Sequence, residues 1–152
     1  MKMQSRVEIK IYLVILWALV MSAISTIINF KAYCKGYMPS TFQSFFSVFC
    51  VLSWVLTSFY CGYKKHMRYL IYCSMFWWIG LFLFILGYIT GILTIGILPI
   101  IVIAGPLYGL RYFTKMPSDI SLVIINVSIS YLLMLVGFLI GKYFSIKNYK
   151  QH

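Results

Sequence analysis

Acidic residues are almost absent from this sequence. Glu8 and Asp119 carry its only two carboxylate side chains, against 13 lysines and arginines, and charged residues make up 10% of the 152 positions. Soluble domains average roughly a quarter charged residues, and a soluble domain this short needs them to cover its large surface. A water-soluble fold is therefore not expected, nor is an active site built on two carboxylic acids in one helix.

Catalytic and metal-binding motifs are also missing. The chain contains no GxSxG, no HExxH and no phosphate-binding glycine loop. Its four cysteines form no CxxC pair and have no zinc-like spacing to His66 or His152. We therefore expect no catalytic residue, no metal ligand and no cofactor, and an intramembrane enzyme is the least favoured function class.

Long apolar runs are what the sequence does have, with 62% hydrophobic and 19% aromatic residues. The run from Ile11 to Phe30 has 20 residues without a charge, enough at about 1.5 Å per residue to cross roughly 30 Å of hydrocarbon. The sequence predicts an all-α integral membrane bundle that forms one transmembrane domain over residues 1–152. Its five transmembrane helices are expected at about 11–30, 43–63, 69–89, 91–110 and 120–141.

The fourth run differs from the others because it contains Gly91, Gly96, Pro99, Gly105, Pro106 and Gly109. Its length favours a full crossing, since membrane helices tolerate proline; the alternative is four crossing helices plus a re-entrant or broken element at 91–110. With a cytoplasmic N-terminus, five crossings put eight lysines and arginines inside and five outside, whereas a returning segment puts nine inside and four outside. The charge count slightly favours the returning segment, and both arrangements stay open.

Asp, Glu, Lys, Arg and His are absent from all five runs, which argues against proton relays and voltage sensors inside the bilayer. Small and polar residues recur there at helical spacing, as expected where helices touch in lipid; a shared polar path is the other interpretation. The predicted helix-packing residues are Gly105, Gly109, Asn126, Ser130, Gly137 and Gly141.

Basic residues fall between the apolar runs, which is typical of loops that orient a protein in the membrane rather than of nucleic-acid binding. Anionic lipid head groups are the expected counter-charge. The residues predicted to contact them are Lys64, Lys65, Arg68, Arg111 and Lys115. Trp77 and Trp78 lie deeper in their run, where they fill a helix contact or line a slot for an apolar ligand.

These patterns favour a small multi-pass protein of a bacterial cell membrane, acting without catalysis as an accessory, immunity or regulatory component through helix contacts. Its partner would be another membrane protein or further copies of the chain. The alternative is a channel or transporter protomer in which Pro99 and Pro106 free the carbonyls of Ile95 and Val102 for coordination. A water-filled cavity around Gly105 and Asn126 would favour that alternative, and a dry bundle there would count against it.

Overall fold

The computed structural model describes residues 2–149, with side chains over residues 11–92 and 94–147. This part of the chain is all-helical, as predicted. Four long helices, α1 (Lys2–Lys35), α2 (Thr41–Tyr63), α3 (Met67–Thr90) and α7 (Ile120–Tyr149), form most of it. Five short helical elements connect α3 to α7, and together we call them the broken segment. They are α4 (Leu93–Pro99), the π-helical η1 (Ile100–Ala104), α5 (Gly105–Leu107), the 3₁₀-helical η2 (Tyr108–Leu110) and α6 (Arg111–Thr114).

Local sequence signals explain where the helices begin and end. The Ser40 hydroxyl accepts a hydrogen bond from the Gln43 amide, and the Gln43 side chain bonds back to the Ser40 amide, so a capping box starts α2. α3 and α4 form a helical hairpin, and in the turn between them Gly91 takes a left-handed backbone conformation with φ of 67°. Glycine adopts this conformation without a Cβ penalty, and α3 stops there.

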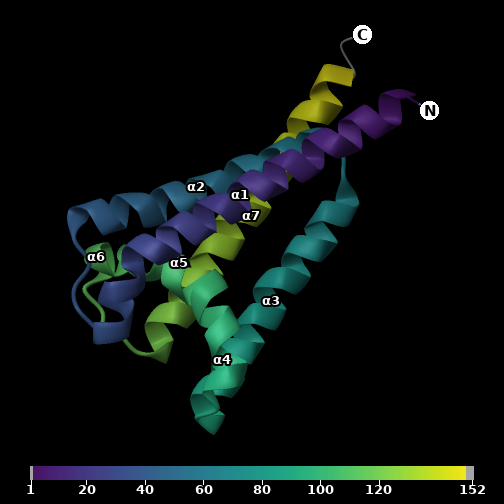
Figure 1. The fold of residues 1–152 in the computed structure, drawn as a ribbon. Coiled ribbons are helices and arrows are strands. Elements are labelled where there is room, and N and C mark those ends of the chain that lie inside the picture. The colour runs from purple at the N-terminus through teal and green to yellow at the C-terminus, as the bar shows by residue number, and fades with distance from the viewer. Residues whose placement is uncertain (1, 150–152) are drawn as a thin grey trace.

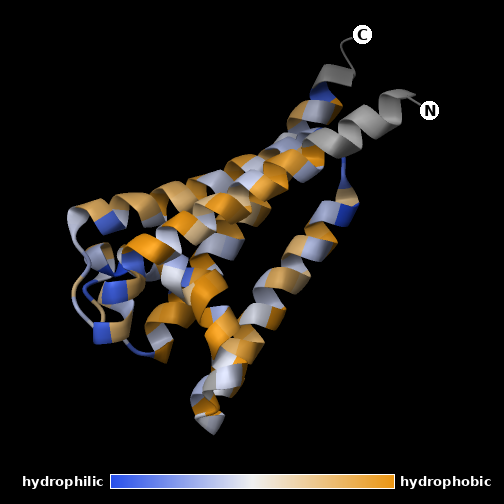
Figure 2. Cartoon of the chain, in the orientation of Figure 1, coloured by the Kyte–Doolittle hydropathy of each residue, from blue (hydrophilic) through white to orange (hydrophobic). Residues whose placement is uncertain are grey.

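The helices share two ends, which Figure 1 shows at the upper right and the lower left. The termini end holds the start of α1, the turn at residues 64–66 and the end of α7. The loop end holds residues 36–40, 91–92 and 115–119. Hydrophilic residues concentrate at these ends and apolar residues cover the helices between them (Figure 2), the distribution that a bilayer requires.

The direction of α7 follows from its contacts with α2 and α3. Gly137 packs against Val55, and Gly141 packs one turn further along against Phe59, so α7 runs parallel to α2. Against α3 the order is reversed, because Met134 contacts Cys73 whereas Phe138 stacks on Tyr69. Both α2 and α7 therefore run from the loop end to the termini end.

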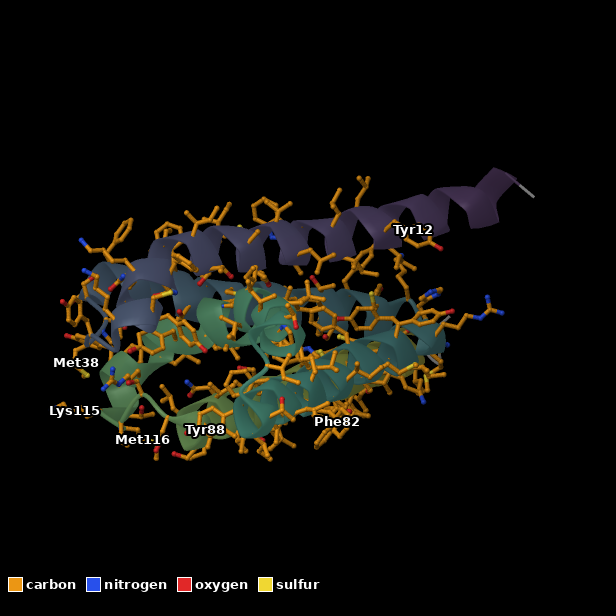
Figure 3. The ribbon with its side chains drawn as sticks, turned by 60° about the horizontal axis from the view of Figure 1, so that its bottom comes forward. Tyr12, Met38, Phe82, Tyr88, Lys115 and Met116 are labelled. Atoms are coloured by element: carbon orange, nitrogen blue, oxygen red, sulfur yellow. The ribbon has the colours of Figure 1, made fainter. Side chains whose placement is uncertain are left out.

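The broken segment consequently leaves the loop end and returns to it. Figure 3 shows Met38 beside Lys115 and Met116 at one end of the molecule, far from Tyr12. Among the described residues, five helical stretches are long and apolar enough to span a membrane, as predicted. Of the two arrangements predicted for the fourth, the helix directions match four crossing helices plus a broken element that returns.

Several predicted bounds differ from those observed. The first span extends from Ile11 to Lys35, and the last from Ile120 to Lys147, beyond the predicted ends at 30 and 141. The apolar runs stop at the first lysine, but a helix can continue past it because a lysine side chain reaches the interface. The fourth stretch, Thr94–Thr114, is shifted from 91–110, since Gly91 ends α3 and Arg111 continues the helical path.

Candidate functional site in the broken segment and its surroundings

The carbonyl of Pro106 is the point at which the broken segment joins α1 and α2. The hydroxyls of Ser25 on α1 and Ser47 on α2 both donate to it, at 2.8 and 2.7 Å. Ser25, Ser47 and Pro106 are all fully buried. Because lipid offers no hydrogen bonds, a backbone carbonyl released by an irregular helix needs such protein donors.

Ser47 does more than donate to Pro106. Its oxygen also accepts from the Gly109 amide at 3.0 Å, so one hydroxyl bridges the N–H and the C=O that face each other across this turn. The neighbouring Ser44 hydroxyl donates to the Gly109 carbonyl at 2.8 Å. Two serines one helical turn apart on α2 thus hold the 3₁₀ turn η2 in place.

The π-helical geometry of η1 determines which backbone carbonyl loses its hydrogen-bond partner to Pro106. In η1 the Gly105 amide bonds to the carbonyl of Ile100, five residues earlier. In the same register Pro106, which has no N–H, leaves the Ile101 carbonyl without its partner. The Thr26 hydroxyl of α1 donates to that carbonyl. The sequence predicted that Pro106 would free the carbonyl of Val102, four residues earlier, on the assumption of an α-helix. The π turn makes the freed carbonyl that of Ile101, five residues earlier, so this prediction was wrong by one residue.

Asn29 also belongs to the cluster and, like Ser25 and Ser47, has an exposed fraction of 0%. Its Nδ2 donates to the carbonyl and hydroxyl of Ser25 and to the hydroxyl of Ser47. Within the described residues, Asn29 Oδ1 has no hydrogen-bond partner. An unpaired buried acceptor is destabilising. The three hydrogen bonds that Asn29 Nδ2 donates to Ser25 and Ser47 offset this loss.

Five of the six predicted packing residues lie against another element of the bundle, and the sixth, Ser130, is buried. A Cβ at Gly105 would lie 3.0 Å from Thr26 Cγ2, and one at Gly109 would overlap the Gln43 carbonyl. Asn126 Nδ2 donates to the Leu107 carbonyl at 3.4 Å. Ser130 is buried, and within the described residues its hydroxyl has no hydrogen-bond partner. The glycines of α7 that contact α2 are Gly137 and Gly141.

Two further close contacts were missed by sequence reasoning. Gly62 lies against the Phe138 backbone, and Gly87 lies against the backbone of Gly96. The sequence pairs Gly87 with Gly91, four residues away, but the partner lies nine residues away across the hairpin. A spacing rule for a single helix cannot identify a pair formed across a turn. The sequence feature that could have indicated it is the presence of glycines on both sides of the turn at residues 91–92.

Arg111 differs from the other four residues predicted to meet lipid head groups. Its exposed fraction is 9%, and its guanidinium donates to the carbonyls of Gly36 and Met116 at 2.8 and 2.7 Å and to the Tyr108 hydroxyl at 2.7 Å. The side chain therefore ties the broken segment to the loops that follow α1 and precede α7. Sequence reasoning put Arg111 at the interface but had no means of seeing these distant carbonyls.

The remaining predicted head-group residues have exposed side chains. Lys115 lies at the loop end, where it takes a left-handed conformation with φ of 52°. At the termini end, Lys64 places its Nζ over the rings of Tyr60 and Tyr63, and Arg68 lies in the first turn of α3. Lipid contact by Lys64, Lys65, Arg68 and Lys115 stays a prediction.

Asp119 caps the start of α7. Its carboxylate accepts hydrogen bonds from the Ser121 hydroxyl and the Leu122 amide. These bonds, the Ser121 hydroxyl first, lower the pKa of the Asp119 carboxyl below its ordinary value. The role is structural, since a capping carboxylate satisfies amides that the first helical turn leaves free.

Two cavities lie beside α3. One of about 320 Å³ opens at the loop end between α1, α3, α4 and α7, and is lined by Tyr33, Tyr88 and Asp119 among others. A second, of about 190 Å³, lies between α3 and α7 beside Trp77 and Trp78, where the sequence suggested an apolar slot. Their linings are mostly apolar, and the described residues include no group of three His, Cys, Asp or Glu that could hold a metal.

Comparison with known proteins identifies no relative: no family model matches the chain, and neither a curated protein nor a solved structure is similar to it. Function is therefore argued from the chain's own contacts.

Proposed function

We propose that this chain is a non-catalytic accessory, immunity or regulatory protein of a bacterial cell membrane, and that it acts by contact with another membrane protein. The observation that carries the proposal is the packing of the broken segment. Gly105 is in close contact with Thr26, and buried Asn126 is bonded to Leu107. Packing this close at Gly105 and Asn126 supports the accessory role over a transport path.

The small-residue face of α7 is covered by α2 of the same chain, because Gly137 and Gly141 pack on Val55 and Phe59. A partner would therefore meet the outer faces of the helices, where large apolar side chains are exposed. Trp17 on α1, Trp78 on α3 and Leu139 on α7 are each more than half exposed. Such faces suit lipid and helix partners alike.

The orientation that we propose has both ends of the described chain in the cytoplasm. The returning path of the broken segment supports it, because the sequence count of lysines and arginines is then nine at the termini end and four at the loop end. The positive-inside rule places the more basic end in the cytoplasm.

The test is purification in mild detergent with a photo-crosslinking residue at position 17, 78 or 139, followed by reconstitution in liposomes. We expect a stoichiometric partner, crosslinked from one of these faces and not from the others, and no ion flux from the chain alone. Recovery of a homo-oligomer without other proteins, together with ion flux that Ser47→Ala alters, would overturn the proposal in favour of a channel protomer.

A further inference from the structure

A small polar slot lies at the termini end, between α1 and α3. Its volume is about 80 Å³, and its lining consists of Ile11, Tyr12, His66, Arg68 and Tyr72. The volume exceeds the roughly 10–15 Å³ that one water needs and is far below the roughly 300–1,000 Å³ of sites that bury drug-sized ligands. The slot therefore fits a group of a few heavy atoms.

The chemistry of the lining selects an anion. Arg68 supplies a permanent positive charge and His66 a ring N–H, while Tyr12 and Tyr72 supply hydroxyl donors. Asp119, the one carboxylate among the described side chains, lies at the loop end, where it lines the cavity of about 320 Å³ with Tyr88 and Gly91. The first turn of α3 contains no acidic residue, and its N-cap His66 makes no side-chain capping bond, so the helix end adds to the positive field.

An apolar groove beside α3 shares Tyr72 with the slot. It has a volume of about 290 Å³ and lies between α3 and the broken segment. Met75 and Ile79, on the turns of α3 that follow, line it further along and are about half exposed. A polar slot and an apolar groove joined at one tyrosine suit a molecule with an anionic head and a hydrocarbon tail.

Tyr12 lies in the part of α1 nearest the termini end, and Figure 3 shows it projecting on the side of α1 where the other helices lie. Its exposed fraction is 70% and that of Tyr72 is 68%. Both rings are therefore accessible from the lipid, as expected of tyrosines at the level of head groups.

We propose that this slot binds the phosphate of one anionic phospholipid, held by Arg68 with Tyr12, His66 and Tyr72, while an acyl chain of that lipid lies in the groove below Tyr72. The site binds a single lipid in a fixed position, in contrast to the diffuse attraction that basic loops exert on an anionic membrane. It is independent of the identity of any protein partner.

The experiment is native mass spectrometry of the full chain released from detergent with phosphatidylglycerol or phosphatidylcholine. We expect one tightly retained phosphatidylglycerol, with retention reduced about tenfold by Arg68→Gln, because a hydrogen bond to a charged group contributes about 1.5 kcal/mol or more. The matched control is Lys64→Gln, which removes the same charge two residues before His66 but outside the slot. This control should change retention less than about twofold.

Equal losses in Arg68→Gln and Lys64→Gln would show charge attraction alone and would overturn the proposal. Displacement of the lipid by inorganic phosphate at millimolar concentration would also overturn it, because the groove would then contribute nothing. Thermal unfolding in phosphatidylcholine provides the folding check. Arg68→Gln should leave the midpoint unchanged there, and a lower midpoint would mean that Arg68 is paired within the chain rather than with lipid.

Discussion

The contacts of α2 and those of α3 differ in kind. On α2, glycines of α7 approach the backbone at Val55 and Phe59, and Ser47 bonds to the broken segment. On α3, Trp77 and Trp78 border a cavity of about 190 Å³, and Phe76 borders another of about 290 Å³. Figure 1 shows α3 diverging from α2 toward the loop end.

This difference follows from the solvent. In lipid, burying one apolar side chain against another yields little, because hydrocarbon tails solvate it equally well. Close backbone approach and hydrogen bonds therefore hold α2 to its neighbours. Apart from the Gly87–Gly96 approach and the Ser74–Tyr131 bond, α3 depends on side-chain packing beside cavities. We expect substitutions at the α2 contacts to unfold the protein more than comparable substitutions on α3.

The largest effect is expected from Gly141→Leu. A Cβ at Gly141 already overlaps the Phe59 carbonyl, so a leucine must force α7 away from α2, at a cost of about 3 kcal/mol in the free energy of unfolding. The measurement is unfolding by SDS titration in mixed micelles. Gly96→Ala is the control, since its Cβ would lie 3.7 Å from Gly87, an ordinary contact; equal destabilisation of both variants would contradict the comparison.

Arg111→Gln should have the next largest effect, about 2 kcal/mol, because it removes a buried charged donor from the part-buried carbonyls of Gly36 and Met116. Faster hydrogen exchange at residues 36–38 and 116 should accompany the loss, since Gly36 and Met116 provide those carbonyls. Lys115→Gln, four residues away and exposed, is the control. Unchanged exchange in Arg111→Gln would mean that the side chain does not tie the loops together.

Ser47→Ala should cost about 1–2 kcal/mol, because both the Pro106 carbonyl and the Gly109 amide lose a bond in a buried setting. Ser53→Ala on the same helix is the matched control. The Ser53 hydroxyl bonds only to the Phe49 carbonyl of its own helix, so its loss should change the free energy of unfolding by a few tenths of a kcal/mol at most. The same SDS titration checks both, and a Ser53→Ala cost equal to that of Ser47→Ala would refute the bridging role.

Tyr131→Phe should have the smallest effect, about 0.6 kcal/mol, the average for a hydrogen bond between membrane helices. Its hydroxyl is 2.8 Å from that of Ser74, at the partly buried contact between α3 and α7. If Tyr131→Phe destabilised the protein as strongly as Ser47→Ala, the distinction between the two regions would fail.

The sequence predicted the helical stretches because charge-free runs of bilayer length have one outcome in a membrane. It also grouped Asn126, Ser130, Gly137 and Gly141 as packing residues of the last helix, since a spacing of three, four or seven along a helix is visible in one chain. The path of the broken segment was not decided, because the two charge counts differ by one residue on each side. The π turn bonds to Thr26 of α1, and Arg111 bonds to Gly36 in a distant loop. Patterns within one segment of the sequence carry no information about such distant partners.

The return of the broken segment to the loop end is the central claim, and cysteine labelling tests it most directly. In intact cells, with the four native cysteines replaced by alanine, single cysteines at positions 38, 115 and 65 react with a membrane-impermeant maleimide according to their side. We predict that positions 38 and 115 react alike, from outside the cell, and that position 65 reacts only after the membrane is opened. Labelling of position 115 together with position 65, on the opposite side from position 38, would contradict the account.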